Sequence, residues 1–300
     1  MKKALCIGIN NYPGFENDLN GCINDANDWT KLYQQFGFEV TTLLDSAARK
    51  LKIKTELQSM IWNSQAGDVL VVSYSGHGTS IPDTSGDEAD FYDEALYVYD
   101  GAIIDDELRD IFKSIPYGVQ MIVILDSCFS GTATRVLLKG STRKKYLELY
   151  PIPQLADLQK RKEFLIGEDM KEILLAGCGD DEYSYDAYIN GRYNGAFTRY
   201  AIDTIRGNFN YEDFMNELRK KLPSREYPQT PQLDCSVENA YRILFTPSVD
   251  SGVDEPDLPT PPEPDNPIEP IQESWWKRNW KKILWGTIIV IVIVISIRFC

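Results

Sequence analysis

The sequence of 300 residues contains a single histidine, His77, and its six cysteines include no Cys-x-x-Cys pair. Cysteines scattered in this way disfavour a zinc knuckle. Basic residues are also few, 31 against 45 acidic ones, for a net charge of -14. This balance argues against a nucleic-acid binder, because affinity for phosphate backbones comes largely from Lys and Arg. Basic peptides or divalent cations are the partners that an acidic protein attracts.

The N-terminus has no long apolar run. Met1-Lys2-Lys3 leads into only six apolar or small residues, so no export signal is visible and we expect reduced thiols. Basic residues are absent from 247–274, which holds eight prolines and eight acidic residues and is predicted to be an extended linker.

Charge of either sign is absent from residues 283–297. Tryptophans and lysines precede this run and Arg298 follows it, which predicts a C-terminal transmembrane helix within 275–300 that crosses the bilayer at 283–298. The run of 15 residues is shorter than the roughly 20 that usually span a bilayer, so a core helix and an interfacial helix are the alternatives. The basic cluster before the run predicts that the large domain faces the cytoplasm.

Residues 1–246 alternate short apolar runs with longer amphipathic ones. The apolar runs predict strands at 4–9, 38–44, 68–74, 120–126, 172–178 and 241–245. The amphipathic runs predict helices at 25–36, 49–62, 105–115, 196–205 and 211–222. This alternation is typical of an α/β sandwich with a mostly parallel sheet.

Two of the predicted strands end in turns that carry reactive side chains. The first runs into YSGHG, which contains His77, and the other runs into DSCFSG, which contains Cys128. Carboxyl ends of parallel strands meet at one edge of a sheet, so an imidazole and a thiol there form a candidate base and nucleophile. Gly76 and Gly78 leave room for backbone amides, and we expect those of Gly78 and Cys128 to hold an oxyanion. A loop histidine and a buried, inert cysteine are the alternative.

These motifs resemble those of the metacaspases and their bacterial, caspase-like relatives. The resemblance rests on YSGHG, on DSCFSG with its cysteine 51 positions after the histidine, and on GCINDA, GDEADFYDEAL, IIDDEL and LLAGCGDDEYSYDAYINGRYNGAFT. It implies a caspase-like three-layer α/β/α sandwich over 1–246, divided into 1–130, a basic linker at 131–170, and 171–246. A monomer is also implied. The sequence departs from the family in having Phe129 where a histidine commonly follows the nucleophile.

The resemblance also implies which substrates are cleaved. It maps the primary substrate pocket onto Cys22, Asp25, Ser75 and Asp126 and implies cleavage after Arg or Lys. Two carboxylates in a small pocket would pair with a guanidinium or ammonium group and repel an acidic side chain. The alternatives are that Asp25 caps a helix and that Asp126 orients a turn.

The chemistry itself needs no cofactor, but the resemblance implies a calcium site at Asp93, Asp105 and Asp106. The fourth acidic position of that site is Arg135 here, which weakens the expectation. A solvated acidic loop is the alternative, and the spacing does not match an EF-hand.

The basic linker leaves two further questions open. A charged run of this kind is most often a solvated surface, yet a peptidase with an acidic pocket would find targets in it, so we predict self-cleavage within 131–170. An alternative function is a caspase-like module without turnover that acts as a membrane-tethered interaction protein. Phe129 and Arg135 are the two departures that favour it.

Overall fold

The computed structural model describes residues 1–82, 92–128, 142–149, 170–179 and 182–247. Its centre is a six-stranded sheet in the order β12-β9-β7-β3-β1-β2. The strands are β1 (Lys2–Gly8), β2 (Glu39–Leu44), β3 (Val69–Ser75), β7 (Gln120–Asp126), β9 (Ile173–Ala176) and β12 (Gln232–Asp234). All pairings are parallel except that of β12 with β9. β3 and β7 are apolar and buried along most of their length, as expected for strands covered on both faces.

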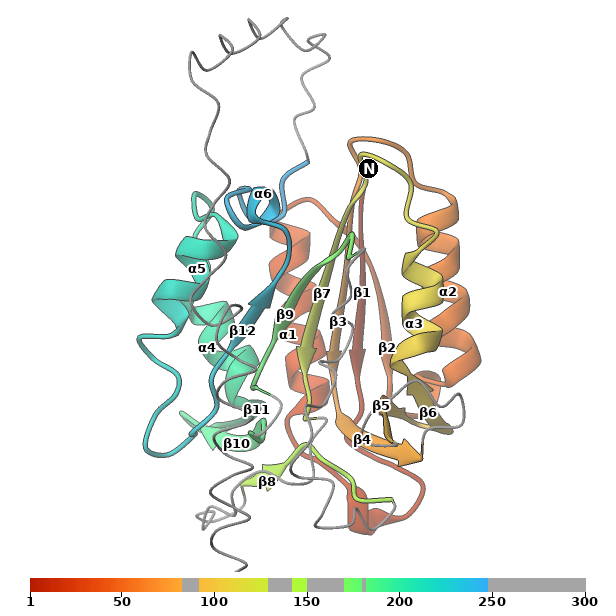
Figure 1. Cartoon of the computed structure of the whole chain (residues 1–300). Coiled ribbons are helices and arrows are strands. Elements are labelled where there is room, and N and C mark those ends of the chain that lie inside the picture. Colours follow the sequence, from red (N-terminus) through yellow and green to blue (C-terminus); the bar gives the residue numbers. More distant parts are fainter. Residues whose placement is uncertain (83–91, 129–141, 150–169, 180–181, 248–300) are drawn as a thin grey trace, which may run out of the picture. The chain divides into compact units, whose positions relative to one another are not determined.

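Helices cover both faces of this sheet (Figure 1). One core holds residues of α1 (Cys22–Gln35), α4 (Ala196–Thr204) and α5 (Tyr211–Leu218), among them Trp29 and Phe214. The other holds residues of α2 (Lys50–Trp62) and α3 (Asp105–Phe112), among them Leu57 and Leu108. The three-layer α/β/α architecture with a mostly parallel sheet is therefore confirmed.

Two small antiparallel sheets lie at the end of the molecule towards which β1, β3 and β7 point (Figure 1). One contains β4 (His77–Pro82), β5 (Tyr92–Val98) and β6 (Gly101–Ile104). The other contains β8 (Arg143–Lys144), β10 (Tyr185–Ile189) and β11 (Arg192–Gly195). Neither sheet was predicted. Both stand at the carboxyl edge of the central sheet, where reactive groups gather in folds of this class.

The predicted strand at 241–245 is wrong. The chain there leaves the short helix α6 (Val237–Ala240) in a turn, and β12, which lies earlier in the chain, fills the edge of the sheet instead. Only the end of the run is buried: Phe245 has a φ of 56° and packs edge-on against Tyr33 and Phe36, whereas Tyr241 and Ile243 are exposed and Ile243 forms a single isolated bridge with Asn210. Single-turn 3-10 helices at Phe15–Asn17 and Asp45–Ala47 complete the assignment.

The remaining predictions for the C-terminus lie outside the described residues. The membrane helix predicted within 275–300 and all of the acidic linker after residue 247 are in this group. Within the ranges that the structure describes, no helix has the length and apolar character needed to cross a membrane.

Candidate active site

His77 is the first residue of β4, directly after β3 and a one-residue turn at Gly76. Its side chain is buried and lies against the ring of Tyr12, with centroids 4.9 Å apart. Nε2 is 2.7 Å from the carbonyl oxygen of Asn17. Burial lowers the pKa of His77 to about 4, so the ring is neutral at pH 7.

The contact with Asn17 decides which ring nitrogen carries the proton. A carbonyl oxygen only accepts hydrogen bonds, so Nε2 of His77 must be the donor. The lone pair of the neutral ring is then on Nδ1, which is buried and has no hydrogen-bond partner among the described residues. Nδ1 is therefore the atom that can take up a proton.

Cys128 lies two residues beyond β7 and is fully buried. Its Sγ accepts a hydrogen bond from the amide of Ser184 at 2.7 Å and is 3.4 Å from the carbonyl oxygen of the same residue. β3 and β7 are paired neighbours in which Ser75 is opposite Asp126, so the two strand exits lie next to each other. The thiol nevertheless contacts Ser184, and no hydrogen bond joins it to His77.

Two backbone amides of these strand exits converge on one oxygen. The amides of Gly78 and Cys128 both donate to the carbonyl oxygen of Lys145, at 2.9 and 3.2 Å. Two donors aimed at a single carbonyl are the arrangement that stabilises the oxyanion of acyl transfer. The structure thus brings together the two amides singled out from the sequence, and it places a peptide bond of the chain itself between them.

The side chain of Lys145 fills the predicted substrate pocket. Its fully buried Nζ lies 2.9 Å from Asp126, 3.2 Å from Asp25 and 2.8 Å from the hydroxyl of Ser75. Burial alone would lower the pKa of Lys145, but the carboxylate of Asp126, with further contributions from Cys22 and Asp25, raises it well above the ordinary value. The ammonium group is therefore charged.

The pocket carboxylates are held by a dense set of hydrogen bonds. Asp25, in the first turn of α1, accepts from Ser75, Asn194 and the amide of Gly195. Asp126, at the end of β7, accepts from Ser184 and from the amide and hydroxyl of Thr198. Cys22, one turn before Asp25, is completely buried, and burial raises the pKa of its thiol well above the ordinary value. All four predicted pocket residues thus surround one ammonium group.

The chain on either side of Lys145 is paired through its backbone with neighbouring segments. Before Lys145, β8 pairs antiparallel with β10, and the amide of Lys145 donates to the carbonyl oxygen of Ser184 at 3.0 Å. After it, the amide of Leu147 donates to Gly78 at 2.9 Å, and the hydroxyl of Thr79 donates to the carbonyl of Leu147 at 2.7 Å. Residues 143–147, which we call the docked segment, therefore occupy the site in the manner of a bound peptide.

Several residues that contact the site were not identified from the sequence. Asn17 reaches the site from a distant segment, and Ser184 and Asn194 belong to the quoted motif at 174–198 but had no assigned role. Asp186 adds a third carboxylate near Lys145, and burial raises its pKa. Gly195 was part of a quoted motif but had no assigned role, and a Cβ at this position would meet Asp126 and the ammonium of Lys145.

The three residues proposed for calcium do not gather as a ligand set. Asp105 and Asp106 begin α3, where both carboxylates form ion pairs with Arg109. Asp93 is buried on β5, and Arg135 lies outside the described residues. Across the described ranges, no group of three His, Cys, Asp or Glu side chains is placed to hold a metal ion. The residues that are described do not fit a calcium site.

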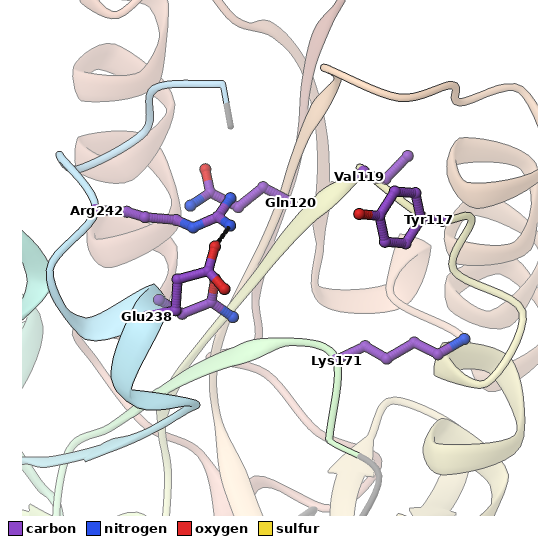
Figure 2. A pocket seen from close by; sticks show the side chains of 8 residues that line it. Tyr117, Val119, Gln120, Lys171, Glu238 and Arg242 are labelled. Atoms are coloured by element: carbon purple, nitrogen blue, oxygen red, sulfur yellow. Dashed lines mark hydrogen bonds and ion pairs between the residues drawn. The ribbon is translucent and has the colours of Figure 1, made fainter. Parts of the chain in front are cut away.

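A cavity of about 160 Å³ lies elsewhere, lined by residues that begin β7 and precede β9 (Figure 2). Its lining includes Gln120, Lys171 and the ion pair of Glu238 with Arg242. The cavity is at the amino ends of the parallel strands, so it does not belong to the site around His77 and Cys128.

Lys145→Met, made in a Cys128→Ala background, is expected to lower the free energy of unfolding by about 3–5 kcal/mol at pH 7, because two buried carboxylates lose their cation. Without the ammonium group, the two buried carboxyls have raised pKa values in the folded state. They therefore take up protons as the pH falls, and part of the lost stability should return. Urea unfolding at pH 7 and pH 5 measures both effects, with Lys144→Met as the matched control. Equal stability of the two variants would show that the Lys145 side chain is not buried in solution.

Comparison with known proteins agrees with this geometry. Residues 1–241 match the family model of the caspase domain. The chain is 31% identical to Metacaspase-1B of Aspergillus oryzae, over 81% of this chain and 70% of the relative, and 31% identical to Metacaspase-1 of Schizosaccharomyces pombe, over 78% and 67%.

Solved structures extend the agreement to the fold. The crystal structure of protein GSU0716 from Geobacter sulfurreducens superposes with a TM-score of 0.63 at 27% identity, covering 82% of this chain and 98% of that one. Caspase-1 of Spodoptera frugiperda shares the fold, with a TM-score of 0.54 at 14% identity, over 78% and 85%. The chain thus belongs to the caspase-domain family of cysteine peptidases, with metacaspases among its relatives.

Proposed function

We propose that the protein is a cysteine endopeptidase that cleaves peptide bonds after Lys or Arg. One observation carries the proposal: Lys145 places its carbonyl oxygen on two backbone amides while its ammonium group is held by Asp25 and Asp126. The carbonyl and the side chain of one residue thus satisfy both requirements of a cleaved residue. An acidic side chain in the same pocket would meet two buried carboxylates, which disfavours cleavage after Asp.

The proposed chemistry uses two side chains. Nδ1 of His77 takes the thiol proton of Cys128, and the thiolate attacks the substrate carbonyl, whose oxygen becomes an anion held by the amides of Gly78 and Cys128. The imidazolium then protonates the leaving amine as the peptide bond breaks. Water activated by the same imidazole hydrolyses the thioester and releases the thiol. No redox or organic cofactor takes part.

Fluorogenic peptides that differ only in the residue before the cleaved bond test the specificity. We expect release from Arg and Lys peptides, none from Asp peptides, and none from any peptide with Cys128→Ala or His77→Ala. Asp25→Asn should lower kcat/KM for the Lys peptide by about 30-fold or more, because a buried partner of the ammonium is lost. A preference for Asp would contradict the pocket assignment.

The proposal extends to self-cleavage, with Lys145-Tyr146 as the bond. This bond lies within the basic linker at 131–170, and its carbonyl is the one that the two amides hold. In the full-length protein we expect a new N-terminus at Tyr146, identified by mass spectrometry, because a bound scissile bond needs no encounter step.

Lys145→Gln should abolish this cut, since a neutral amide cannot replace an ammonium between two carboxylates. Lys144→Gln is the matched control one residue away: it removes the ammonium that meets the Tyr183 ring but keeps Lys145, so the cut at Tyr146 should be slowed at most and not abolished. An active protein that is cut only at other linker bonds, with Lys145-Tyr146 intact, would contradict the assignment.

Calcium stimulation, implied by the resemblance, has its own test. Because Asp105 and Asp106 are both already paired with Arg109, we expect EDTA to leave the rate of Lys-peptide cleavage unchanged. A rate that falls with EDTA and returns only with Ca²⁺ would show that Arg109 gives way to the ion.

Location and assembly remain proposals from the sequence. A helix at 283–298 would tether the domain to a membrane with its site facing the cytoplasm, and the domain would act as a monomer on protein or peptide substrates. The compact unit at 1–251 is consistent with a self-contained peptidase domain.

A further inference from the structure

The two side chains that precede Lys145 in the docked segment also contact defined partners. The ammonium of Lys144 lies 3.6 Å from the centroid of the Tyr183 ring. The guanidinium of Arg143 donates to the main-chain carbonyl of Asp18. The two residues before Lys145 are therefore both basic, and each of them meets an acceptor in the protein.

Tyr183 is suited to select a cation at this position. Its ring is buried in the cluster that contains Cys128 and Cys178, so its position follows from the same packing that fixes the nucleophile. The negative face of a tyrosine ring attracts an ammonium group, and burial of the ring strengthens the attraction. Lys144 is opposite Tyr185 in the strand pairing, so the main chain fixes its register relative to Tyr183.

Glu182, which precedes Tyr183 in the sequence, holds the surrounding loop in place. Glu182 accepts hydrogen bonds from the hydroxyl and amide of Thr230 and from the amide of Gly179, which ties down the loop that carries Tyr183. Glu182 thus helps to hold in place the aromatic ring that the ammonium of Lys144 meets.

We propose that Tyr183 is a specificity-determining residue that favours a basic side chain immediately before the cleaved Lys or Arg. The substrate class is thus a dibasic peptide segment bound as an extended strand. This inference rests on the proposed function and deepens it, because it assigns a second recognition site to the same cleft.

The test compares two peptides on the full-length protein. Both end in Lys-aminocoumarin, and the residue before that lysine is either lysine or norleucine, which has a similar length without the charge. The docked segment competes equally with both, so the ratio of their kcat/KM values does not depend on how many clefts are open. We expect lysine to be favoured by roughly threefold to 30-fold, the range of a cation on an aromatic face.

Two variants distinguish the electrostatic effect of the aromatic ring from the effect of its size. Tyr183→Phe keeps the aromatic face and should keep the preference, whereas Tyr183→Leu keeps an apolar group and should bring the ratio close to one. In Tyr183→Leu, the fall should be in kcat/KM for the lysine peptide, with the norleucine peptide changed little.

The outcomes are distinct. Equal cleavage of the two peptides by the unaltered protein would overturn the inference and leave the proposed function intact, whether or not the variants fold. A preference that survives Tyr183→Leu would also overturn it, since another group would then recognise the cation. Failure to cleave either peptide, with Arg peptides equally resistant, would overturn the proposed function and this inference with it.

Discussion

The buried ion cluster of Lys145, Asp25 and Asp126 is the interaction on which the site depends. The two carboxylates come from α1 and from the end of β7, and one ammonium group from a third segment holds them together. Buried charges are tolerated only when they are paired and fully hydrogen-bonded. Four further parts of the chain lie around the pocket and donate hydrogen bonds to the two carboxylates, through Ser75, Asn194, Gly195, Ser184 and Thr198.

The same cluster explains why the groups of the proposed site are in place while a segment of the chain itself occupies the cleft. Recognition of a basic side chain needs two buried carboxylates, and two buried carboxylates without a cation repel each other. A lysine of the chain itself meets this need and brings its peptide bond to the amides of Gly78 and Cys128. The thiol, however, is hydrogen-bonded to Ser184 and not to His77. Proton transfer in the proposed mechanism therefore needs these two side chains to approach each other.

Sequence patterns predicted the parts of the fold that depend on local periodicity. The apolar runs that became β3 and β7 are buried strands, and their ends brought His77 and Cys128 to one edge of the sheet. The run at 241–245 also reads as apolar, but only Leu244 and Phe245 are buried, with Phe245 packed against Tyr33 and Phe36 outside the sheet. Periodicity alone does not distinguish this kind of burial from that of a strand.

The docked segment was beyond sequence reasoning for a related reason. A basic stretch predicts a solvated surface, and Lys145 is nevertheless among the most buried side chains, because its partners lie 120 positions earlier and 19 positions earlier in the chain. Nothing near Lys145 in the sequence distinguishes it from Lys144, whose ammonium meets a tyrosine ring instead. Which lysine enters the pocket is decided by the strand register with β10, which is a long-range property.

This register bears on the choice between a peptidase and a module without turnover. A binding module needs strand pairing and side-chain pockets, and the docked segment has both. It does not need two amides converging on one carbonyl oxygen, nor a buried, neutral imidazole whose Nδ1 has no hydrogen-bond partner within the described part of the chain. Those two features serve the formation of a tetrahedral intermediate, and an unpartnered buried nitrogen has a cost that simple binding would not offset. The arrangement of the described residues thus favours catalysis, although Phe129 and Arg135, which lie outside them, depart from the family pattern.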